Sequence, residues 1–423
     1  MKSRNLLFVA LLAIIVVSSH PAVAQKSGLV NDTVTLGPGY ANEVYYSMSS
    51  GTKATVARNQ WDIAFRTPIL SSSIITNDGS GVMLYTYPKA DTAGWSNLDT
   101  TGISTLEPLY NSLKDWELGA FNTFSKGQFD YGWGLYNITT HNLTGDSLYV
   151  IKLRNGVYRK LWIVQKLSSL NKYNIRYAAL DGTGDVTATI DCGLYTTHNF
   201  VGFSIADSKV VDFETTAATS WDLLFTKYMG LSGTTPYPVT GVLSNDKVGV
   251  IKSHTVFLTY SQWDPALFNT AREVVGYDWK TFTGTAYKIV DSLVYFVQDK
   301  SGNINRLIFK DFAGSSTGRI VLQKEKISVL GIDEITANKM NAVVYPNPVK
   351  DIANLVINPG NSSSVKVYVM DTRGRVVLNS TFKARENTLS TLQIALPQLA
   401  DGIYLVVINT ESGRITQKII VKN

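Results

Sequence analysis

Cysteine is nearly absent from this chain, because Cys192 is the only one among 423 residues. A lone thiol cannot form an internal disulfide, and it excludes zinc sites built from several thiolates. Between Asp191 and Gly193 it is expected to be a small buried hydrophobe. Stability must therefore come from packed cores, for which a hydrophobic content of 44% is ample.

Histidine and recognisable catalytic motifs are also scarce. The chain has 4 histidines, and its sequence shows no His-Glu-x-x-His motif and no phosphate-binding loop. Paired carboxylates for glycoside hydrolysis are revealed only by their separation in space. We therefore expect a protein that is not an enzyme, and no catalytic residue is named.

A basic surface for nucleic acids is missing as well. The formal net charge is +6, but residues 344–423 alone hold nine basic and five acidic side chains, and Lys2 and Arg4 lie at the extreme N-terminus. The region between residues 25 and 343 is nearly neutral. It has no cluster of Lys and Arg of the kind that tracks phosphates, so we expect no nucleic-acid partner.

The longest apolar run of the chain lies at its N-terminus. Lys2 and Arg4 precede an apolar run at residues 6–17, and the small residues Ala22-Val23-Ala24 follow it. This pattern is typical of a secretory signal peptide, here residues 1–24. About 12 apolar residues are too few for a bilayer span of roughly 20. We expect a secreted protein with no membrane-spanning segment in the mature chain.

Short alternating runs dominate the chain from Thr33 to about residue 329. Apolar residues recur at every second position, with many β-branched and aromatic side chains, for example at residues 147–153, 157–163 and 288–296. Period two is the pattern of strands. The dipeptide Asn155-Gly156 favours a hairpin turn between two of these runs. The sequence therefore predicts an all-β protein.

An internal repeat divides this β-rich region. Residues 61–67 and 221–227 both open on Trp-Asp and continue with the same alternation, and Asp146-Ser147-Leu148 matches Asp291-Ser292-Leu293. A repeat of this length indicates one structural unit used twice. We predict two tandem β modules, at residues 25–192 and 193–330. The first has an extra segment at about residues 88–126, in which residues 112–116 are the best candidate for a short helix.

The Trp-Asp motifs also predict which side chains face a core. In a strand, Trp61, Ile63 and Phe65 would share one face, as would Trp221, Leu223 and Phe225, and these faces are expected to be buried. Asp62 and its counterpart Asp222 would point the other way. A short carboxylate in this position most often accepts hydrogen bonds from nearby backbone or from a hairpin turn. We expect a structural role for both.

The last eighty residues have a different character. A linker at residues 331–343 leads to a predicted small C-terminal β-sandwich at residues 344–423. This tail resembles the type A C-terminal sorting domain of the type IX secretion system of Bacteroidota. Among the residues that carry the resemblance are Pro346, Asn347, Pro348, Gly374, Gly402, Tyr404 and Lys418. An unrelated carbohydrate-binding or fibronectin-like module is the alternative.

The resemblance of the tail has implications for partner and location. It implies recognition by the type IX secretion machinery as a sorting signal. It further implies export through the periplasm and a final position outside the cell or attached to its outer surface.

The repeated module is similar to the HmuY-type haem-binding surface proteins. The similarity rests on the strand at residues 61–65 and on the hairpin at residues 150–160. It implies an HmuY-like fold for both modules, with haem or a haem protein as a partner. In that family two side chains hold the iron, commonly histidines and in relatives sometimes methionine.

Few side chains of the mature chain could bind a haem iron. The mature chain offers the histidines His141, His198 and His254, and the methionines Met83 and Met229 as softer partners. We take His141 and His198 as the first candidates. Loop histidines and core methionines more often have no metal ligand role, so each remains a hypothesis.

A surface structural or adhesive protein without a small ligand is the second possible function. The 22 tyrosines and 8 tryptophans suit broad contact faces, although packing between strands explains them equally well. A binding module differs from such a protein in one respect, because it needs a concave pocket with convergent polar groups.

Overall fold

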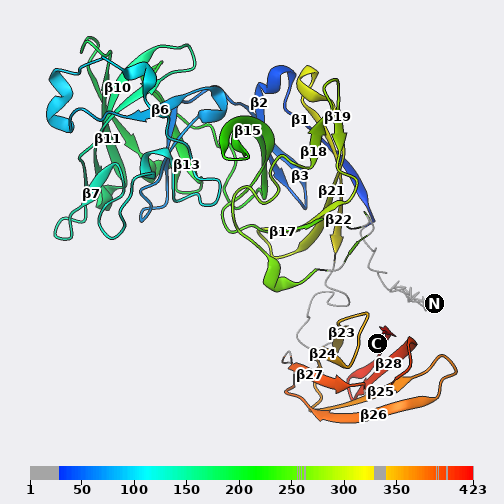
Figure 1. Cartoon of the computed structure of the whole chain (residues 1–423). Coiled ribbons are helices and arrows are strands. Elements are labelled where there is room, and N and C mark those ends of the chain that lie inside the picture. Colours follow the sequence, from blue (N-terminus) through cyan, green and yellow to red (C-terminus); the bar gives the residue numbers. More distant parts are fainter. Residues whose placement is uncertain are drawn as a thin grey trace, which may run out of the picture.

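The computed structural model describes residues 28–254, 256, 258, 260–261, 263–327, 340–386, 388, 390–396 and 399–422. These residues form an all-β protein, as predicted, in which strands are joined by turns and 3-10 segments of at most five residues (Figure 1). In this part of the chain no helix is long and apolar enough to cross a membrane. The predicted signal peptide and most of the predicted linker lie outside the described residues.

The first module is a sandwich of two antiparallel sheets. The larger has seven strands, β6 (Met83–Thr86), β7 (Gly134–Tyr136), β8 (Leu143–Gly145), β9 (Leu148–Lys152), β10 (Tyr158–Leu167), β11 (Lys172–Ala178) and β12 (Val186–Asp191). The smaller has four, β4 (Ile63–Arg66), β5 (Ile74–Thr76), β13 (Phe200–Ser204) and β14 (Lys209–Val211). The predicted hairpin at Asn155-Gly156 joins β9 and β10.

The second module repeats this sandwich. Its larger sheet has five strands, β1 (Val30–Thr35), β17 (Gly249–His254), β20 (Leu293–Gln298), β21 (Ile304–Phe312) and β22 (Arg319–Ile327). Its smaller sheet has β2 (Asn42–Ser47), β3 (Gly51–Ala57), β15 (Leu223–Ser232) and β16 (Thr235–Ser244). A separate hairpin consists of β18 (Lys280–Phe282) and β19 (Tyr287–Ile289).

The two modules have the same strand order, but the second is permuted. The order β14-β13-β4-β5 corresponds to β3-β2-β15-β16, and β12-β11-β10-β9-β6 corresponds to β1-β22-β21-β20-β17. The first three strands of the chain therefore occupy the places that β12, β13 and β14 occupy in the first module. Both ends of the modular region build the second module, and the first module is inserted between β3 and β15.

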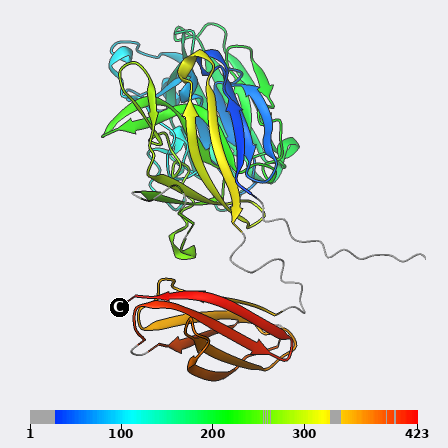
Figure 2. The same ribbon diagram turned by 90° about the vertical axis from the view of Figure 1, so that its right-hand side faces the viewer.

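The figures show this arrangement directly. In Figure 1 the blue strand β1 lies beside the yellow strand β22, and β2 lies beside the green strand β15, although these partners are far apart in the chain. Figure 2 shows the same neighbours from the side. The pairing of β1 with β22 and of β2 with β15 joins them.

The predicted module boundaries differ from this pairing. Residues 25–192 and 193–330 were expected to form tandem units, but β1–β3 pair with the second module, and β13, which pairs with β4, belongs to the first. The repeat signal begins at each Trp-Asp pair. It therefore carries no information about strands that precede the first copy.

Four sheets lie in successive layers across the two modules. Ile63 and Phe65 of β4 belong to the core of the first sandwich, and Leu223 and Phe225 of β15 belong to the core of the second. The alternate residues of these strands, among them Ala64 and Leu224, pack into a third cluster that the two four-stranded sheets share. Strands β4 and β13, most of β2 and the first four residues of β15 are therefore buried on both faces.

The tryptophans of the repeat belong to this shared cluster, which corrects the prediction. Trp61 and Trp221 were expected to share a face with the core residues that follow them, yet both lie between the modules. Trp61 stacks on Phe213 with ring centroids 4.6 Å apart, and Trp221 meets Tyr45 edge to face at 5.1 Å. Each tryptophan precedes its strand, and the bend at the following aspartate ends the simple alternation.

The aspartates behave as expected. Asp62 accepts the backbone N–H groups of Ile205 at 2.8 Å and Ala206 at 3.2 Å, and it pairs with Arg154 at the β9–β10 hairpin. Asp222 accepts those of Met48 at 2.7 Å and Lys300 at 2.8 Å. In each module the carboxylate thus joins the end of a neighbouring strand to the hairpin across the sandwich.

The extra segment of the first module contains turns, not the helix predicted at residues 112–116. Trp116 Nε1 donates to the carbonyl of Ser244 at 3.0 Å, and Arg272 Nη1 donates to the carbonyl of Ser112 at 2.7 Å. The Arg272 guanidinium lies 3.8 Å from the centroid of the Trp116 ring. Contacts with the second module hold this segment, so an amphipathic helix is not required.

A buried carboxylic acid lies in the contact between the modules. Glu43 of β2 accepts hydrogen bonds from Thr226 at 3.1 Å and from the Tyr45 hydroxyl at 3.4 Å. It lines a cavity of about 60 Å³ between the modules. Burial raises the pKa of Glu43 to about 7, against the opposing effects of the Thr226 hydrogen bond and the Arg58 charge.

The C-terminal tail is a small sandwich with a core of its own. Its sheets contain β23 (Asn341–Tyr345), β24 (Ile352–Asn358) and β27 (Ser390–Ala395) on one side, and β25 (Ser364–Met370), β26 (Val376–Lys383), β28 (Gly402–Thr410) and β29 (Gly413–Val421) on the other. The buried residues between them form one separate cluster. The fold agrees with the sandwich predicted for residues 344–423, and its first strand begins three residues earlier.

The residues that suggested a sorting signal mostly hold this sandwich together. Asn347, between Pro346 and Pro348, donates to the Lys418 carbonyl at 3.0 Å and accepts the N–H of Ile420 at 2.8 Å. The Asn347 side chain therefore attaches the start of the domain to the backbone of its last strand, β29.

The glycines and the tyrosine of the signal lie at strand ends. Gly374 has a φ of 78° in the turn between β25 and β26, where a side chain would be strained. Gly402 is the first residue of β28, and the hydroxyl of Tyr404 donates to the Ala400 carbonyl at 3.0 Å.

The permuted pairing predicts a cross-link. Thr33 of β1 lies directly opposite Val321 of β22, outside the cores, and opposite residues of an antiparallel pair place their side chains on one face. We expect Thr33→Cys combined with Val321→Cys to form a disulfide under mild oxidation. Non-reducing electrophoresis should show faster migration, because the bond closes a loop around the whole first module. Each single variant is the control, and absence of the cross-link in the folded protein would contradict the pairing.

The buried glutamate predicts a pH dependence. Because the pKa of Glu43 rises from 4.5 to about 7 on folding, the folded protein holds a proton that the unfolded chain releases between these values. The free energy of unfolding therefore falls as pH rises through this window. Glu43→Gln should gain up to roughly 3 kcal/mol relative to the native protein from pH 4.5 to pH 8. Urea unfolding at both pH values measures this, and exposed Glu107→Gln is the control. A difference independent of pH would contradict the expectation.

Candidate functional site

An open depression of about 420 Å³ lies on the first module. This size is within the range of small-molecule sites. Ten residues line it: Ile69, Leu70, Ser71, Ser72, Tyr131, Tyr136, His141, Leu143, Lys166 and Ser168. They combine apolar surface with phenol, hydroxyl and imidazole groups, and no carboxylate is among them.

Three parts of the first module build the depression. Residues 67–73, the loop between β4 and β5, supply one wall, and the end of β10 supplies Lys166. The third wall consists of β7, β8 and the turn between them. Strands β7 and β8 have no counterpart in the larger sheet that the described residues of the second module form. One wall of the depression is therefore built by strands without a counterpart in the described part of the second module.

His141 is held in a defined orientation at this site. Its φ of 59° is uncommon for a residue with a side chain, and its backbone N–H donates to the Asn137 carbonyl at 2.8 Å. The ring nitrogen Nδ1 lies 2.6 Å from the Tyr136 hydroxyl, and Tyr136 stacks on Phe129 at 5.8 Å. When Nδ1–H donates to the phenol oxygen, the lone pair of Nε2 is free to bind a ligand, as in metal-binding histidines.

The loop at residues 67–73 is held by donors from the first module. Lys166 Nζ donates to the carbonyls of Ile69, at 2.8 Å, and Ser71. Trp133 Nε1 donates to the Ser72 carbonyl at 2.9 Å. Lys166 is almost fully buried, and burial lowers its pKa to about 8. The loop carbonyls thus have fixed partners.

The tip of this fixed loop is apolar and exposed. Leu70 has 93% of its surface open to solvent, and Ile69 is 52% exposed. Phe129, which stacks on Tyr136, and Ile138 in the β7–β8 turn are also largely exposed. An apolar rim around a depression is typical of surfaces that contact a ligand or partner.

The structure separates the two predicted haem ligands. His141 lines the depression, whereas His198 precedes β13 with Nδ1 3.3 Å from Asp212 and its ring beside Tyr195. His198 is not among the lining residues. Proximity of two histidines depends on loop placement, which no local pattern in the sequence reports.

The other potential ligands lie elsewhere. His254 ends β17 in the second module. The sulfur of Met83 accepts a hydrogen bond from Tyr85 at 3.3 Å, and Met229 lies in β15 with its backbone N–H directed to Asp78. Among the described residues no group of three or more His, Cys, Asp or Glu side chains could hold a metal ion.

Sequence reasoning missed most of the lining. Tyr136 and Lys166 gave no signal, because each looks like an ordinary strand residue until the tertiary structure places it beside His141. Cys192, in contrast, is fully buried as predicted. Burial raises the pKa of its thiol to about 12, so it is inert as a nucleophile.

The fit of a haem group to this site can be tested residue by residue. His141 could supply one nitrogen ligand to the iron, and Tyr131, Tyr136 and the apolar rim could contact the macrocycle. A second histidine or a methionine is not among the lining residues. The lining therefore offers one imidazole to a metal ion and no second histidine or methionine.

Solved structures provide only distant comparisons. Latent PorU from Porphyromonas gingivalis is 12% identical, with 92% of this chain and 34% of that chain covered at a TM-score of 0.18. PorZ, a surface component of the type IX secretion system of the same organism, is 12% identical, with 68% and 44% covered at 0.16. The BSP domain of a biofilm-associated protein is 8% identical, with 94% and 81% covered at 0.17. The chain thus spans less than half of the first two, and such scores support no functional argument.

The sequence comparisons are informative for the tail. A comparison with curated proteins finds no match. The family model described as the secretion system C-terminal sorting domain matches residues 343–422. This range covers the sandwich of β23 to β29 almost entirely. Residues 343–422 are therefore a type IX secretion sorting domain, and the chain is an exported protein destined for the cell surface or the surrounding medium.

Proposed function

We propose that this chain is a non-enzymatic binding protein of the cell surface or medium whose ligand occupies the depression on the first module. The observation that carries the proposal is His141, which a left-handed backbone and Tyr136 hold at the depression. Strained or fixed side chains at a concave surface are typical of ligand sites.

Haem or a related porphyrin is the leading ligand. The resemblance to HmuY-type proteins supports it, and His141 would hold the iron through Nε2. When bound, the iron would supply the coordination that fixes the ligand in place. The chain itself contributes the imidazole, aromatic surface from Tyr131 and Tyr136, and the apolar rim at Leu70.

An adhesive protein without a small ligand is the second candidate. The exposure of Leu70, Phe129 and Ile138 favours it, because such a rim could contact another macromolecule directly. The two candidates differ in whether the interior of the depression or only its rim is used.

The first test is an absorbance titration of the mature chain, residues 25–423, with oxidised and reduced haem. We expect a saturable shift of the Soret band at one haem per chain and at least tenfold weaker binding by His141→Ala. His198→Ala and His254→Ala, which alter histidines outside the depression, should bind as the native protein does. A flat titration would exclude haem, and an unchanged His141→Ala titration would exclude this site.

The second test concerns export. Deletion of residues 344–423 removes the sorting domain while leaving both module cores intact, because the tail has its own core. We expect the truncated chain to stay in the periplasm, since the type IX machinery has no signal to recognise. Cell fractionation measures the location, and circular dichroism checks the fold of the retained chain. Normal surface delivery of a folded truncated chain would contradict the assignment.

A further inference from the structure

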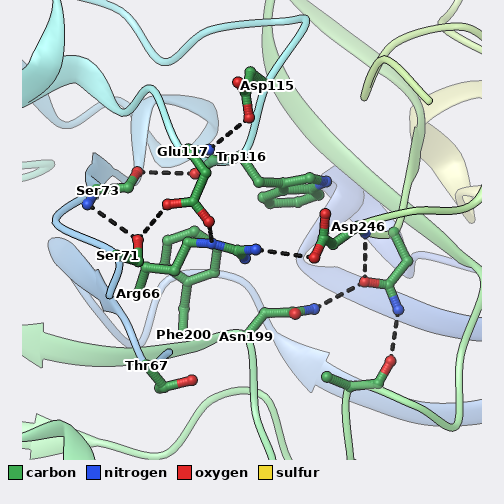
Figure 3. Close-up of polar contacts among 12 residues, drawn as sticks. Arg66, Thr67, Ser71, Ser73, Asp115, Trp116, Glu117, Asn199, Phe200 and Asp246 are labelled. Carbon is green, nitrogen blue, oxygen red and sulfur yellow. Dashed lines mark hydrogen bonds and ion pairs between the residues drawn. The ribbon is translucent and has the colours of Figure 1, made fainter. Parts of the chain in front are cut away.

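A chain of polar contacts connects the depression with the second module. Ser71 lines the depression, and its hydroxyl donates a hydrogen bond to the Glu117 carboxylate. Glu117 in turn forms an ion pair with Arg66 of β4. Arg66 Nη2 lies 3.0 Å from a carboxylate oxygen of Asp246, which belongs to the second module. Figure 3 shows these side chains in one line across the contact between modules.

Arg66 is the central member of this chain. Its side chain is 4% exposed, whereas those of Glu117 and Asp246 are 47% and 32% exposed. The guanidinium also lies 5.6 Å from the centroid of the Phe200 ring. A buried arginine with two carboxylate partners has one favourable position, since loss of either partner leaves part of its charge uncompensated.

Asp246, where this series of polar contacts ends in the second module, is firmly held. The N–H of Asp246 donates to Asn245 Oδ1 at 2.7 Å, and Asn245 Nδ2 donates to the carbonyls of Trp221 at 2.7 Å and Ala218 at 2.8 Å. Lys300 donates to the carbonyl of Asp246. Asp246 therefore presents its carboxylate from a fixed turn.

A second route joins the same loop to the second module. Ser73 Oγ donates to the carbonyl of Trp116 at 2.8 Å, and the indole of Trp116 donates to the Ser244 carbonyl at 3.0 Å. Both routes start in the loop at residues 67–73. Both routes end in the second module, at Ser244 and Asp246, which are close in the sequence.

We propose that the second module braces the loop at residues 67–73 of the first module, which means that it fixes the position of this loop. Arg66, Glu117 and Asp246 are the positioning residues. The donors of the first module hold the loop carbonyls, but the side chain of Ser71 takes its orientation from Glu117. Glu117 takes its orientation from Arg66, and Arg66 depends on Asp246 across the contact between modules. The effect on ligand affinity rests on the proposed function, whereas the bracing of the loop does not.

Amide hydrogen exchange in the ligand-free mature chain tests the brace. The amides of Ser71 and Ser73 donate to the Pro68 carbonyl and to Ser71 Oγ, so their protection reports the loop. Asp246→Asn keeps the shape of the side chain and removes its charge. We expect about tenfold faster exchange at these two amides in Asp246→Asn and in Glu117→Gln. The double variant should exceed the larger single effect only slightly, because both act through Arg66.

Matched controls separate bracing from general loss of stability. Asp311→Asn breaks an exposed ion pair with Arg319 in the same module and should leave the loop amides unchanged. Asp246→Glu keeps the charge and should restore part of the protection. Unchanged exchange at Ser71 and Ser73 in Asp246→Asn would overturn the proposal, as would equal acceleration at core amides such as that of Ile163.

A ligand arm uses haem as the probe. If the native chain binds haem, Asp246→Asn should weaken the binding about threefold, because a less fixed loop must be ordered on binding, although Asp246 does not line the depression. Unchanged haem affinity would overturn the link between brace and ligand. If the native chain binds no haem, the proposed ligand is wrong, and the exchange experiment still decides the brace.

Discussion

The burial of both faces of the central strands in two small sheets is the constraint on which the rest of the structure depends. In β4 and in the first four residues of β15 consecutive side chains are all buried, and their apolar side chains lie alternately in a module core and in the cluster between modules. A sheet that is apolar on both faces cannot remain exposed on one of them without a large cost in hydration free energy. Trp61, Trp116 and Trp221 fill the space between the sheets. The two modules therefore form one unit of four layers and are not two independent domains.

Permutation of the second module strengthens this unity. Strands β1–β3 complete the second sandwich from the N-terminal end of the described chain, and Asp222 joins the end of β2 to the β20–β21 hairpin. The second core is therefore complete only when residues far apart in the chain have met. Asp62 makes the equivalent contact in the first module entirely from contiguous sequence. The same contact geometry thus occurs in both modules, although the strands that it joins are connected differently along the chain.

The candidate site is a local addition to this scaffold. Strands β7 and β8 and the loop at residues 67–73 surround the depression, and Lys166 of β10 and Trp133, just before β7, donate the hydrogen bonds that hold the loop. Rigid elements that support a short exposed loop are a common basis for recognition, because little conformational entropy is lost on binding. The sorting tail, with a separate core, determines where this site is displayed and takes no part in building it.

Local pattern in the sequence determined the strand class, the hairpin at Asn155-Gly156, the burial of Cys192, the roles of Asp62 and Asp222, and the identity of the tail. Each of these depends on neighbours in the chain or on a compact motif. The tertiary structure alone decided that the tryptophans lie between modules, that residues 112–116 form turns, and that His141 and His198 lie apart. It also decided which module the first three strands complete. These features depend on contacts between residues distant in sequence, and the energy of such contacts leaves no periodic trace in the chain.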